Sequence, residues 1–168
     1  MTAPFTVAEL RNAFAQMSSP ALIRLITEID DHGPIPPRRL AGTLPDLSPH
    51  QLRRATEMAR TMGLCRIGPG VGLELTPSGA ELADLYDATA RWARHNSYPH
   101  PICDFTTRVR QTFQLMGQSV LAVTADGSHR PAADQRADEN LDRVRAMLYQ
   151  RLHFEAQAAT HVEFEPAA

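Results

Sequence analysis

One stretch of the chain decides the fold: Leu47-Ser48-Pro49-His50-Gln51-Leu52-Arg53-Arg54, leading through Gly63-Leu64-Cys65-Arg66-Ile67 to Leu73-Glu74-Leu75-Thr76-Pro77-Ser78-Gly79. Ser48 is a favoured N-cap residue, and Pro49 suits the first helical position, where its missing N–H would have no partner anyway. Gln51 completes the pattern of a capping box, and Gly63 is a typical residue to end the helix. The stretch therefore predicts a helix, a β-hairpin and a second helix.

The first of these helices has two faces of different chemistry. Apolar residues recur at three- and four-residue spacing, at Leu52, Ala55, Met58, Ala59 and Met62. Polar residues fall largely outside this stripe, at His50, Gln51, Arg53, Arg54, Glu57 and Arg60. Glutamine and arginine can bond base edges in the major groove of DNA and the phosphates beside them, so the composition is that of a recognition helix. A solvated face whose arginines pair with Glu57 explains this helix alone equally well.

The elements upstream favour the recognition helix. Ser19-Pro20 opens a helix with Leu22, Ile23, Ile26 and Ile29 on one face, and Gly33-Pro34 ends it. A short strand at Ile35 and about two helical turns over 37–44 follow, before Pro45 stops the helix. The tight connection over 45–47 gives a helix-turn-helix arrangement, in which the second helix enters the DNA groove and Arg38 and Arg39 flank the backbone.

A hairpin and a long helix follow. Strands over 64–67 and 71–75 are joined by the turn residues Gly68-Pro69-Gly70, which makes a wing. Thr76-Pro77 begins an amphipathic helix that runs to about Asn96, with Leu82, Leu85, Tyr86, Thr89 and Trp92 on one face. The sequence therefore predicts a mainly α fold: a winged helix-turn-helix over 19–96 with a short β-hairpin wing.

Residues from about 19 to 95 resemble the HxlR branch of winged-helix transcriptional regulators, within the broader MarR- and PadR-like winged-helix group. The matching pieces are Arg39-Leu40, Leu44-Pro45-Asp46-Leu47-Ser48, Leu52, Gly63-Leu64 with Arg66, Leu75-Thr76-Pro77-Ser78-Gly79, Leu82 and Trp92-Ala93. The resemblance covers under half of the chain and implies a homodimeric DNA-binding protein that represses or activates nearby genes. The turn over 68–72 lacks the family's usual charge and tyrosine, and no cysteine precedes Cys65, so a minor-groove contact of the wing and a thiol switch do not carry over.

Further helices are predicted on both sides of this domain. A capping box at Thr6-Val7-Ala8-Glu9 opens an N-terminal helix within residues 1–18. After a linker at Pro99-His100-Pro101, the apolar spacing from Phe105 to Val123 predicts a helix of about six turns, and a last helix is predicted over about 133–159. The C-terminal helices, within 102–159, are expected to form a hairpin that dimerises the protein and sets two recognition helices about 34 Å apart, while 160–168 form a flexible tail.

The same region carries apolar side chains that would line an effector pocket between helices. The candidates are Trp92, Tyr98, Phe105, Phe113, Met116 and Met147. An apolar small molecule that favoured one spacing of the two DNA-reading heads would change operator affinity. A stripe of this kind is, however, more often a core or a dimer seam than a ligand cavity.

Composition limits the classes of function. All seventeen basic residues are arginine, and the formal net charge is −2. Residues 1–125 carry twelve arginines against eleven acids, whereas residues 126–168 carry five against eight, so we expect the C-terminal part to keep away from DNA. No apolar run of membrane-spanning length and no charged-then-apolar leader occurs, which predicts a cytoplasmic protein without a membrane partner.

The motifs that carry catalysis or bind cofactors are missing from the sequence. There is no Gly-x-Ser-x-Gly elbow, no lysine-containing phosphate loop and no Cys-x-x-Cys pair, so neither a catalytic residue nor a cofactor is predicted. His95, His100, Cys103 and Asp104 are close in sequence, but their spacing matches no standard zinc pattern, and no metal site is predicted. Cys103, beside an expected helix start, is the better candidate for a reactive thiol, with an inert packed thiol as the commoner case, and Cys65 is expected to be structural.

The leading hypothesis is a sequence-specific transcriptional regulator, not an enzyme, that acts as a homodimer on double-stranded DNA. Its DNA-binding residues would be Arg38, Arg39, Ser48, His50, Gln51, Arg53, Arg54, Arg60 and Arg66. Two alternatives stay open: a winged-helix interaction or dimerisation module without DNA binding, and a small-molecule-binding protein whose DNA reading has decayed. A coherent positive stripe on the face of the recognition helix favours DNA, and a neutral or buried face favours a protein contact.

Overall fold

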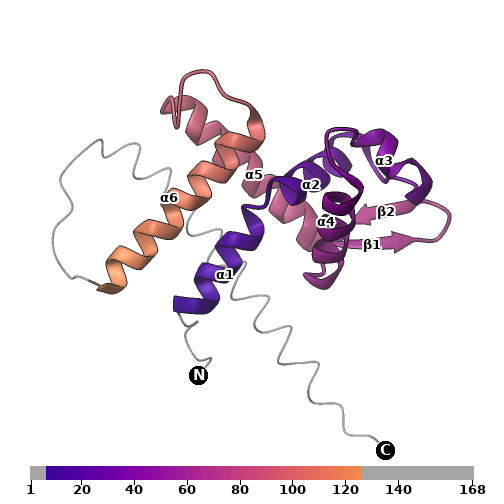
Figure 1. Cartoon of the computed structure of the whole chain (residues 1–168), viewed down its shortest axis with the longest axis horizontal. Coiled ribbons are helices and arrows are strands. Elements are labelled where there is room, and N and C mark those ends of the chain that lie inside the picture. Colours follow the sequence, from indigo (N-terminus) through magenta and orange to yellow (C-terminus); the bar gives the residue numbers. More distant parts are fainter. Residues whose placement is uncertain (1–6, 126–168) are drawn as a thin grey trace, which may run out of the picture. The chain divides into compact units, whose positions relative to one another are not determined.

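The computed structural model describes residues 7–125, which are mainly helical with one small β-hairpin (Figure 1). In chain order the elements are α1 (Val7–Met17), α2 (Pro20–His32), the 3-10 turn η1 (Pro37–Arg39), α3 (Leu40–Thr43), α4 (Pro49–Thr61), β1 (Cys65–Gly68), β2 (Gly72–Leu75), α5 (Pro77–His95) and α6 (Phe105–Ala125). This order is compatible with the expected winged helix. Within these residues, no helix combines the length and the apolar character needed to cross a membrane.

The helices begin and end where the local sequence signals predict. α4 begins with a complete capping box, in which the Gln51 N–H donates to Ser48 Oγ at 3.3 Å and the Ser48 N–H donates to Gln51 Oε1 at 2.8 Å. α2 ends before Gly33, whose φ of 85° suits glycine, and α5 begins after Thr76, whose hydroxyl accepts from the Gly79 N–H at 3.1 Å. The predicted bounds of these three helices are confirmed.

A single residue outside the hairpin, Ile35, pairs with its second strand. β1 and β2 are antiparallel, and Ile35 forms an isolated bridge to Leu73, with N–H to carbonyl distances of 2.9 and 2.8 Å in the two directions. Gly72 has a φ of 112°, and a Cβ there would collide with the Ile35 backbone. The glycine therefore permits the close approach, and the short strand expected at Ile35 is reduced to a single bridge.

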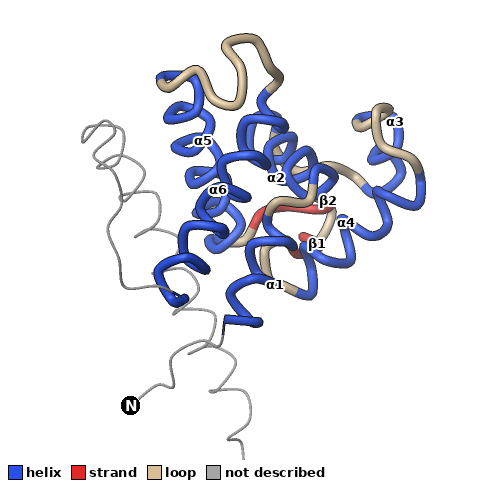
Figure 2. Tube along the Cα trace, turned by 60° about the vertical axis from the view of Figure 1, so that its left-hand side comes forward, coloured by secondary structure: helices blue, strands red, loops and turns tan. Residues whose placement is uncertain are grey.

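The core lies around α2, which contacts α4, α5, α6 and β2. Figures 1 and 2 show α5 and α6 together on one side of α2, with α4 and the hairpin on the other. Leu22, Ile23 and Ile26 of α2 are fully buried. Arg24 donates from Nε and Nη2 to the Asp46 carboxylate, at 2.9 and 3.2 Å, and so ties α2 to the connection that leads into α4.

α6 packs within its own chain over the residues whose burial is described. Val109, Phe113 and Met116 are completely buried, and the Phe113 ring meets Phe14 and Tyr86 edge-on, with centroid distances of 6.3 and 5.7 Å. This part of the apolar stripe is therefore core, because it leaves no area for a dimer contact. The predicted helix over 133–159, the tail at 160–168 and Thr6 of the N-terminal capping box lie outside the described residues.

Candidate nucleic-acid interface

α4 turns its polar residues to solvent and its small apolar residues to the core. Leu52, Ala55 and Ala59 are buried, whereas His50, Gln51, Arg53, Arg54 and Arg60 are exposed. Among the residues that the structure describes, Arg53, Arg54 and Arg60 form no ion pair, and Glu57 forms none either. The arginines of α4 are therefore not neutralised by Glu57, and their guanidinium groups remain available to an anionic partner.

Two of the predicted DNA-binding residues are already used to begin the helix. The Ser48 hydroxyl oxygen accepts the Gln51 N–H, and Gln51 Oε1 accepts the Ser48 N–H. Ser48 can still donate its hydroxyl proton, and Gln51 can still donate from its amide nitrogen. The sequence pattern assigned both a capping and a DNA-reading role to Gln51, and the capping role takes its carbonyl oxygen.

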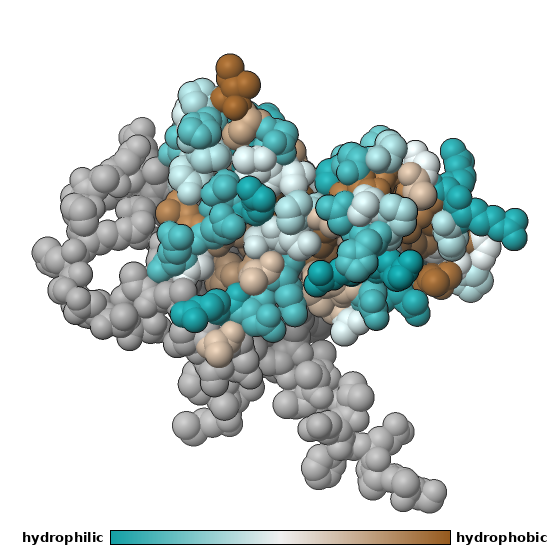
Figure 3. Space-filling view, in the orientation of Figure 1, coloured by the Kyte–Doolittle hydropathy of each residue, from teal (hydrophilic) through white to brown (hydrophobic). Residues whose placement is uncertain are grey.

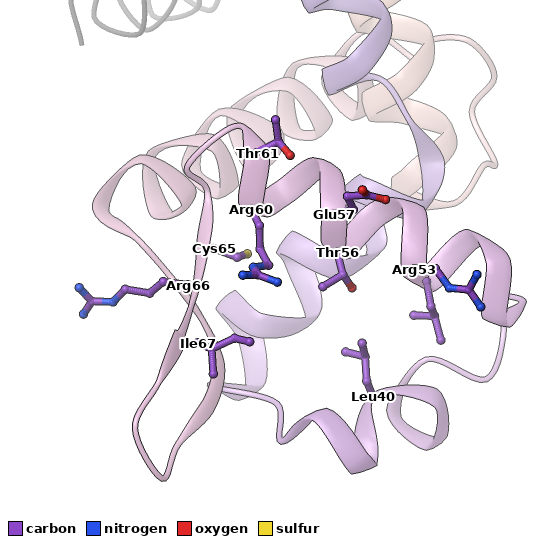
Figure 4. Close-up of a pocket in the computed structure, with 10 residues that line it drawn as sticks. Leu40, Arg53, Thr56, Glu57, Arg60, Thr61, Cys65, Arg66 and Ile67 are labelled. Carbon is purple, nitrogen blue, oxygen red and sulfur yellow. The ribbon is translucent and has the colours of Figure 1, made fainter. Parts of the chain in front are cut away.

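A groove of about 890 Å³ runs between α4, α3 and β1, and we call it the wing groove. Figure 4 shows Arg60 extending from α4 toward β1, Leu40 and Ile67 pointing into the groove, and Arg66 pointing away from it. The charged residues in its lining are Arg53, Arg60, Arg66 and Glu57. Arg66 pairs with Glu74, so Arg53 and Arg60 are the arginines of this lining that form no ion pair with a described residue, against the single carboxylate of Glu57. The wing groove is therefore suited to an anionic partner.

The hairpin side of the wing groove ends in an apolar tip. Arg66 Nε donates to Glu74 Oε1 at 2.7 Å across the hairpin, but the Arg66 side chain is still 68% exposed. Ile67 and Val71 are 57% and 47% exposed, and the turn between them carries no charge. Arg38 and Arg39 are exposed in η1, just before the groove residue Leu40.

Surface chemistry is uneven across the described part of the chain. Hydrophilic residues cover much of the face in Figure 3 over the α2 to α4 region, with apolar areas between them. Acidic side chains come together on α2 and α5, where burial and then repulsion from Asp31, Asp84 and Asp87 raise the pKa of Asp30. The unpaired arginines therefore lie on α4, whereas the clustered acidic side chains lie on α2 and α5.

The two cysteines lie in different surroundings, Cys65 buried and Cys103 half-buried. Cys65 is buried in β1, and burial raises the pKa of its thiol to about 11, so the thiol stays protonated at neutral pH. Cys103 Sγ donates to the His100 carbonyl at 3.4 Å. Asp104 caps α6 by accepting from the N–H and hydroxyl of Thr107, at 2.9 and 2.6 Å, and these hydrogen bonds hold its pKa below the usual value. Within residues 7–125, no cluster of three or more His, Cys, Asp or Glu could hold a metal ion.

The six candidates for an effector pocket are separated by the fold. Trp92 and Tyr98 contact each other, with ring centroids 5.9 Å apart, and Phe105 is half-buried at the start of α6. Phe113 and Met116 are fully buried in the core, and Met147 lies outside the described residues. A ligand that reached Phe113 or Met116 would have to displace core packing.

The wing groove includes residues that the sequence pattern did not single out. Leu40, Thr56 and Ile67 line it beside the predicted arginines, and their sequence positions carry no motif that marks such a role. No protein-family model, no curated protein and no solved structure matches the chain.

Proposed function

We propose that this protein is a sequence-specific DNA-binding regulator of transcription, built as a winged helix-turn-helix of the HxlR type and active as a homodimer. The observation that carries the proposal is the wing groove, where Arg53 and Arg60 of α4 form no ion pair with any described residue. Across the groove Arg66 bonds Glu74 but is still 68% exposed. The unpaired positive charge of α4 favours a polyanionic partner such as DNA over a neutral one.

The dimensions of α4 support the proposal. A helix with its side chains is about 10–12 Å across, which fits the major groove of B-DNA, about 12 Å wide. Arg53, near the start of α4 and on its exposed face, has the fork-shaped donor set that pairs with guanine O6 and N7. Arg60 and Arg66, on the two sides of the wing groove, are suited to phosphates between the helix and the hairpin.

The homodimer is proposed because regulators of this kind read palindromic DNA sites, and not because the structure contains a subunit contact. Two copies of α4 about one DNA turn apart, roughly 34 Å, would read a palindromic site. The described stripe of α6 is buried within one chain, so the dimer contact is assigned to other surfaces, with the helix predicted over 133–159 as the candidate.

The test is a selection of duplex DNA from a random pool by the full-length protein, followed by titrations at several salt concentrations. We expect enrichment of a palindromic site, salt-sensitive binding and a stoichiometry of two chains per site. Arg53→Ala should weaken binding to the selected site by about 1–3 kcal/mol and relax the preference at one base position. Arg91→Ala, an exposed arginine of α5, is the matched control and should bind as the wild type does.

Two results would contradict the proposal. If no sequence is enriched and binding is absent at low salt, the protein-interaction or dimerisation module becomes the better description. If an apolar compound binds while DNA does not, the description is a small-molecule-binding protein whose DNA reading has decayed.

A further inference from the structure

α4 has a second depression along its other flank, toward the junction of α1 and α2. Two adjacent cavities of about 380 and 340 Å³ share Gln16, Arg54 and Met58 in their lining, and we call the pair the α1 trough. Ser19 and Ala21 line it from the junction, and His50 lines it from the first turn of α4. The trough therefore joins α1, which lies outside the predicted DNA-binding domain, to α4.

The two hollows make α4 a ridge. Glu57 and Thr61 border both the wing groove and the α1 trough, and both residues are exposed. Arg53 and Arg60 face the wing groove, whereas Arg54 and His50 face the trough. The basic residues of a single helix are thus divided between its two flanks.

A ridge between two hollows matches the cross-section of a DNA major groove. A helix about 10–12 Å across fills a groove about 12 Å wide, so one sugar–phosphate backbone must pass along each flank of the helix. We propose that the α1 trough seats the backbone of one DNA strand while the wing groove seats the backbone of the other. This inference rests on the proposed function and extends the DNA interface to the junction of α1 and α2.

The chemistry of the trough fits phosphate. No acidic side chain lines its larger cavity, where the basic residues are Arg54 and His50, and Glu57 is the acidic residue that lines the smaller cavity beside Arg54. Gln16 offers an amide donor, and the Ser19 hydroxyl forms no capping hydrogen bond to α2. These four side chains present donors to an anion, and phosphate oxygens take most protein–DNA hydrogen bonds. Arg54 then holds a phosphate rather than a base.

The seat is held in place from the core. The Tyr86 hydroxyl donates to the Met17 carbonyl oxygen at 2.7 Å, and the Ser19 N–H donates to the Gln16 carbonyl oxygen at 3.1 Å. Phe14, on the preceding turn, packs against Phe113. The backbone that carries Gln16 and Ser19 is therefore held in place before DNA arrives, which lowers the entropic cost of binding.

The experiment uses the full-length protein and a duplex that the wild type selects from a random pool, with single phosphates neutralised as methylphosphonates on either strand. Arg54→Ala should weaken binding about tenfold on selected and unrelated duplexes alike, and reduce the slope of log affinity against log salt by about 1. A methylphosphonate on one strand should remove most of the Arg54→Ala effect. The position that removes the Arg60→Ala effect should lie on the other strand.

A charge placed in the trough gives a second arm that leaves every donor intact. Ala15 is exposed and lines the trough, so Ala15→Glu should weaken all DNA binding about tenfold by repelling phosphate. Ala8→Glu puts the same charge on the same face of α1 about 10 Å away along the helix and should change affinity by no more than about twofold. Circular dichroism of both variants checks that α1 remains folded.

The outcomes separate this inference from the proposed function. If the wild type selects a duplex but Ala15→Glu binds like Ala8→Glu, the trough does not face DNA and the inference is wrong while the function stands. An Arg54→Ala loss confined to the selected sequence, with an unchanged salt slope, would overturn it too, because Arg54 would then read a base. If the wild type selects no duplex, the proposed function fails first.

Discussion

α4 and α6 are both amphipathic helices that carry arginines, and the fold uses them in opposite ways. α6 buries large side chains at Val109, Phe113 and Met116, and the Nε atoms of Arg108 and Arg110 are buried without a hydrogen-bond partner among the described residues. α4 buries mainly small side chains and leaves its arginines in solvent. An apolar stripe in a sequence thus predicts that one face of a helix is buried. Whether the opposite face stays exposed to a partner depends on how the other helices pack.

The sharpest test of this contrast is Phe113→Ala. The ring is fully buried between Phe14 and Tyr86, so its removal should lower the free energy of unfolding by about 3–5 kcal/mol. Chemical denaturation of the full-length protein measures the loss, and Gln114→Ala, an exposed neighbour on α6, should change stability by less than about 0.5 kcal/mol. A variant that stays stable but no longer dimerises would instead make the α6 stripe a subunit seam.

The converse test is Arg60→Ala on α4. The side chain is exposed and reaches into the wing groove, so DNA binding should weaken by about 1.5 kcal/mol while the melting temperature stays within a degree or so of the wild type. Titration with a selected duplex and thermal unfolding are measured on the same sample. A lower melting temperature with unchanged binding would mean that Arg60 supports the fold rather than the interface.

Ser48 contributes both to folding and to the proposed DNA interface, because its hydroxyl caps α4 and it is one of the predicted DNA-binding residues. Ser48→Ala should lower the free energy of unfolding by about 1 kcal/mol because the Gln51 N–H loses its acceptor. Ser48→Asp keeps an acceptor and should restore stability, but its carboxylate at the interface should still weaken DNA binding. Denaturant titrations and DNA titrations of the two variants separate these effects; equal DNA affinity of Ser48→Asp and the wild type would place the N-terminus of α4 away from phosphate.

The smallest expected effect is the change in stability caused by ionisation of Asp30, in the acidic cluster of α2 and α5. Burial and repulsion raise the pKa of Asp30, so its ionisation opposes folding. Wild-type stability relative to Asp30→Asn is therefore highest below the unfolded pKa of about 4 and falls as the pH rises through the folded pKa, by less than about 0.5 kcal/mol because the group is exposed.

Asp46 gives the opposite sign and serves as the comparison for Asp30. The hydrogen bond from Arg24 lowers the pKa of Asp46, so its contribution is present above the unfolded pKa and is lost as the pH falls through the folded pKa. Unfolding of Asp30→Asn and Asp46→Asn, each followed from pH 3 to pH 7, should yield curves that deviate from the wild type in opposite directions. Deviations in the same direction would contradict both assignments.

Most of the described secondary structure follows from local sequence signals. The capping box of Ser48, the prolines at the first helical positions and the glycine-rich turn act within a few residues, so the bounds of α2, α4 and α5 could be predicted. The strands, predicted over 64–67 and 71–75, are each displaced by one residue at one or both ends, and Gly68 belongs to β1 rather than to the turn. The mainly helical class with one hairpin is thus readable from the chain. That Ile35 contributes one bridge and not a strand depends on its approach to Gly72, which lies 37 residues later.

The residues of the candidate site could be predicted in part from the sequence, but the shape of its surface could not. The exposed residues of α4 follow from its periodicity, and Arg53, Arg54 and Arg60 were found that way. The division of these arginines between two hollows depends on where α1, α3 and β1 end beside α4, and no local pattern encodes this. Gln16 and Leu40 are brought to α4 by tertiary packing, and so no local sequence pattern marks either residue.

The pairing of Trp92 with Tyr98 makes the protein its own optical reporter. Trp92 is the only tryptophan in the chain and lies on the last turns of α5, so its emission observes that end of the fold and no other. An emission change during unfolding follows the α5 end directly. A change in emission on adding DNA or an apolar compound would show, without any label, that the surroundings of Trp92 at this end of α5 had changed.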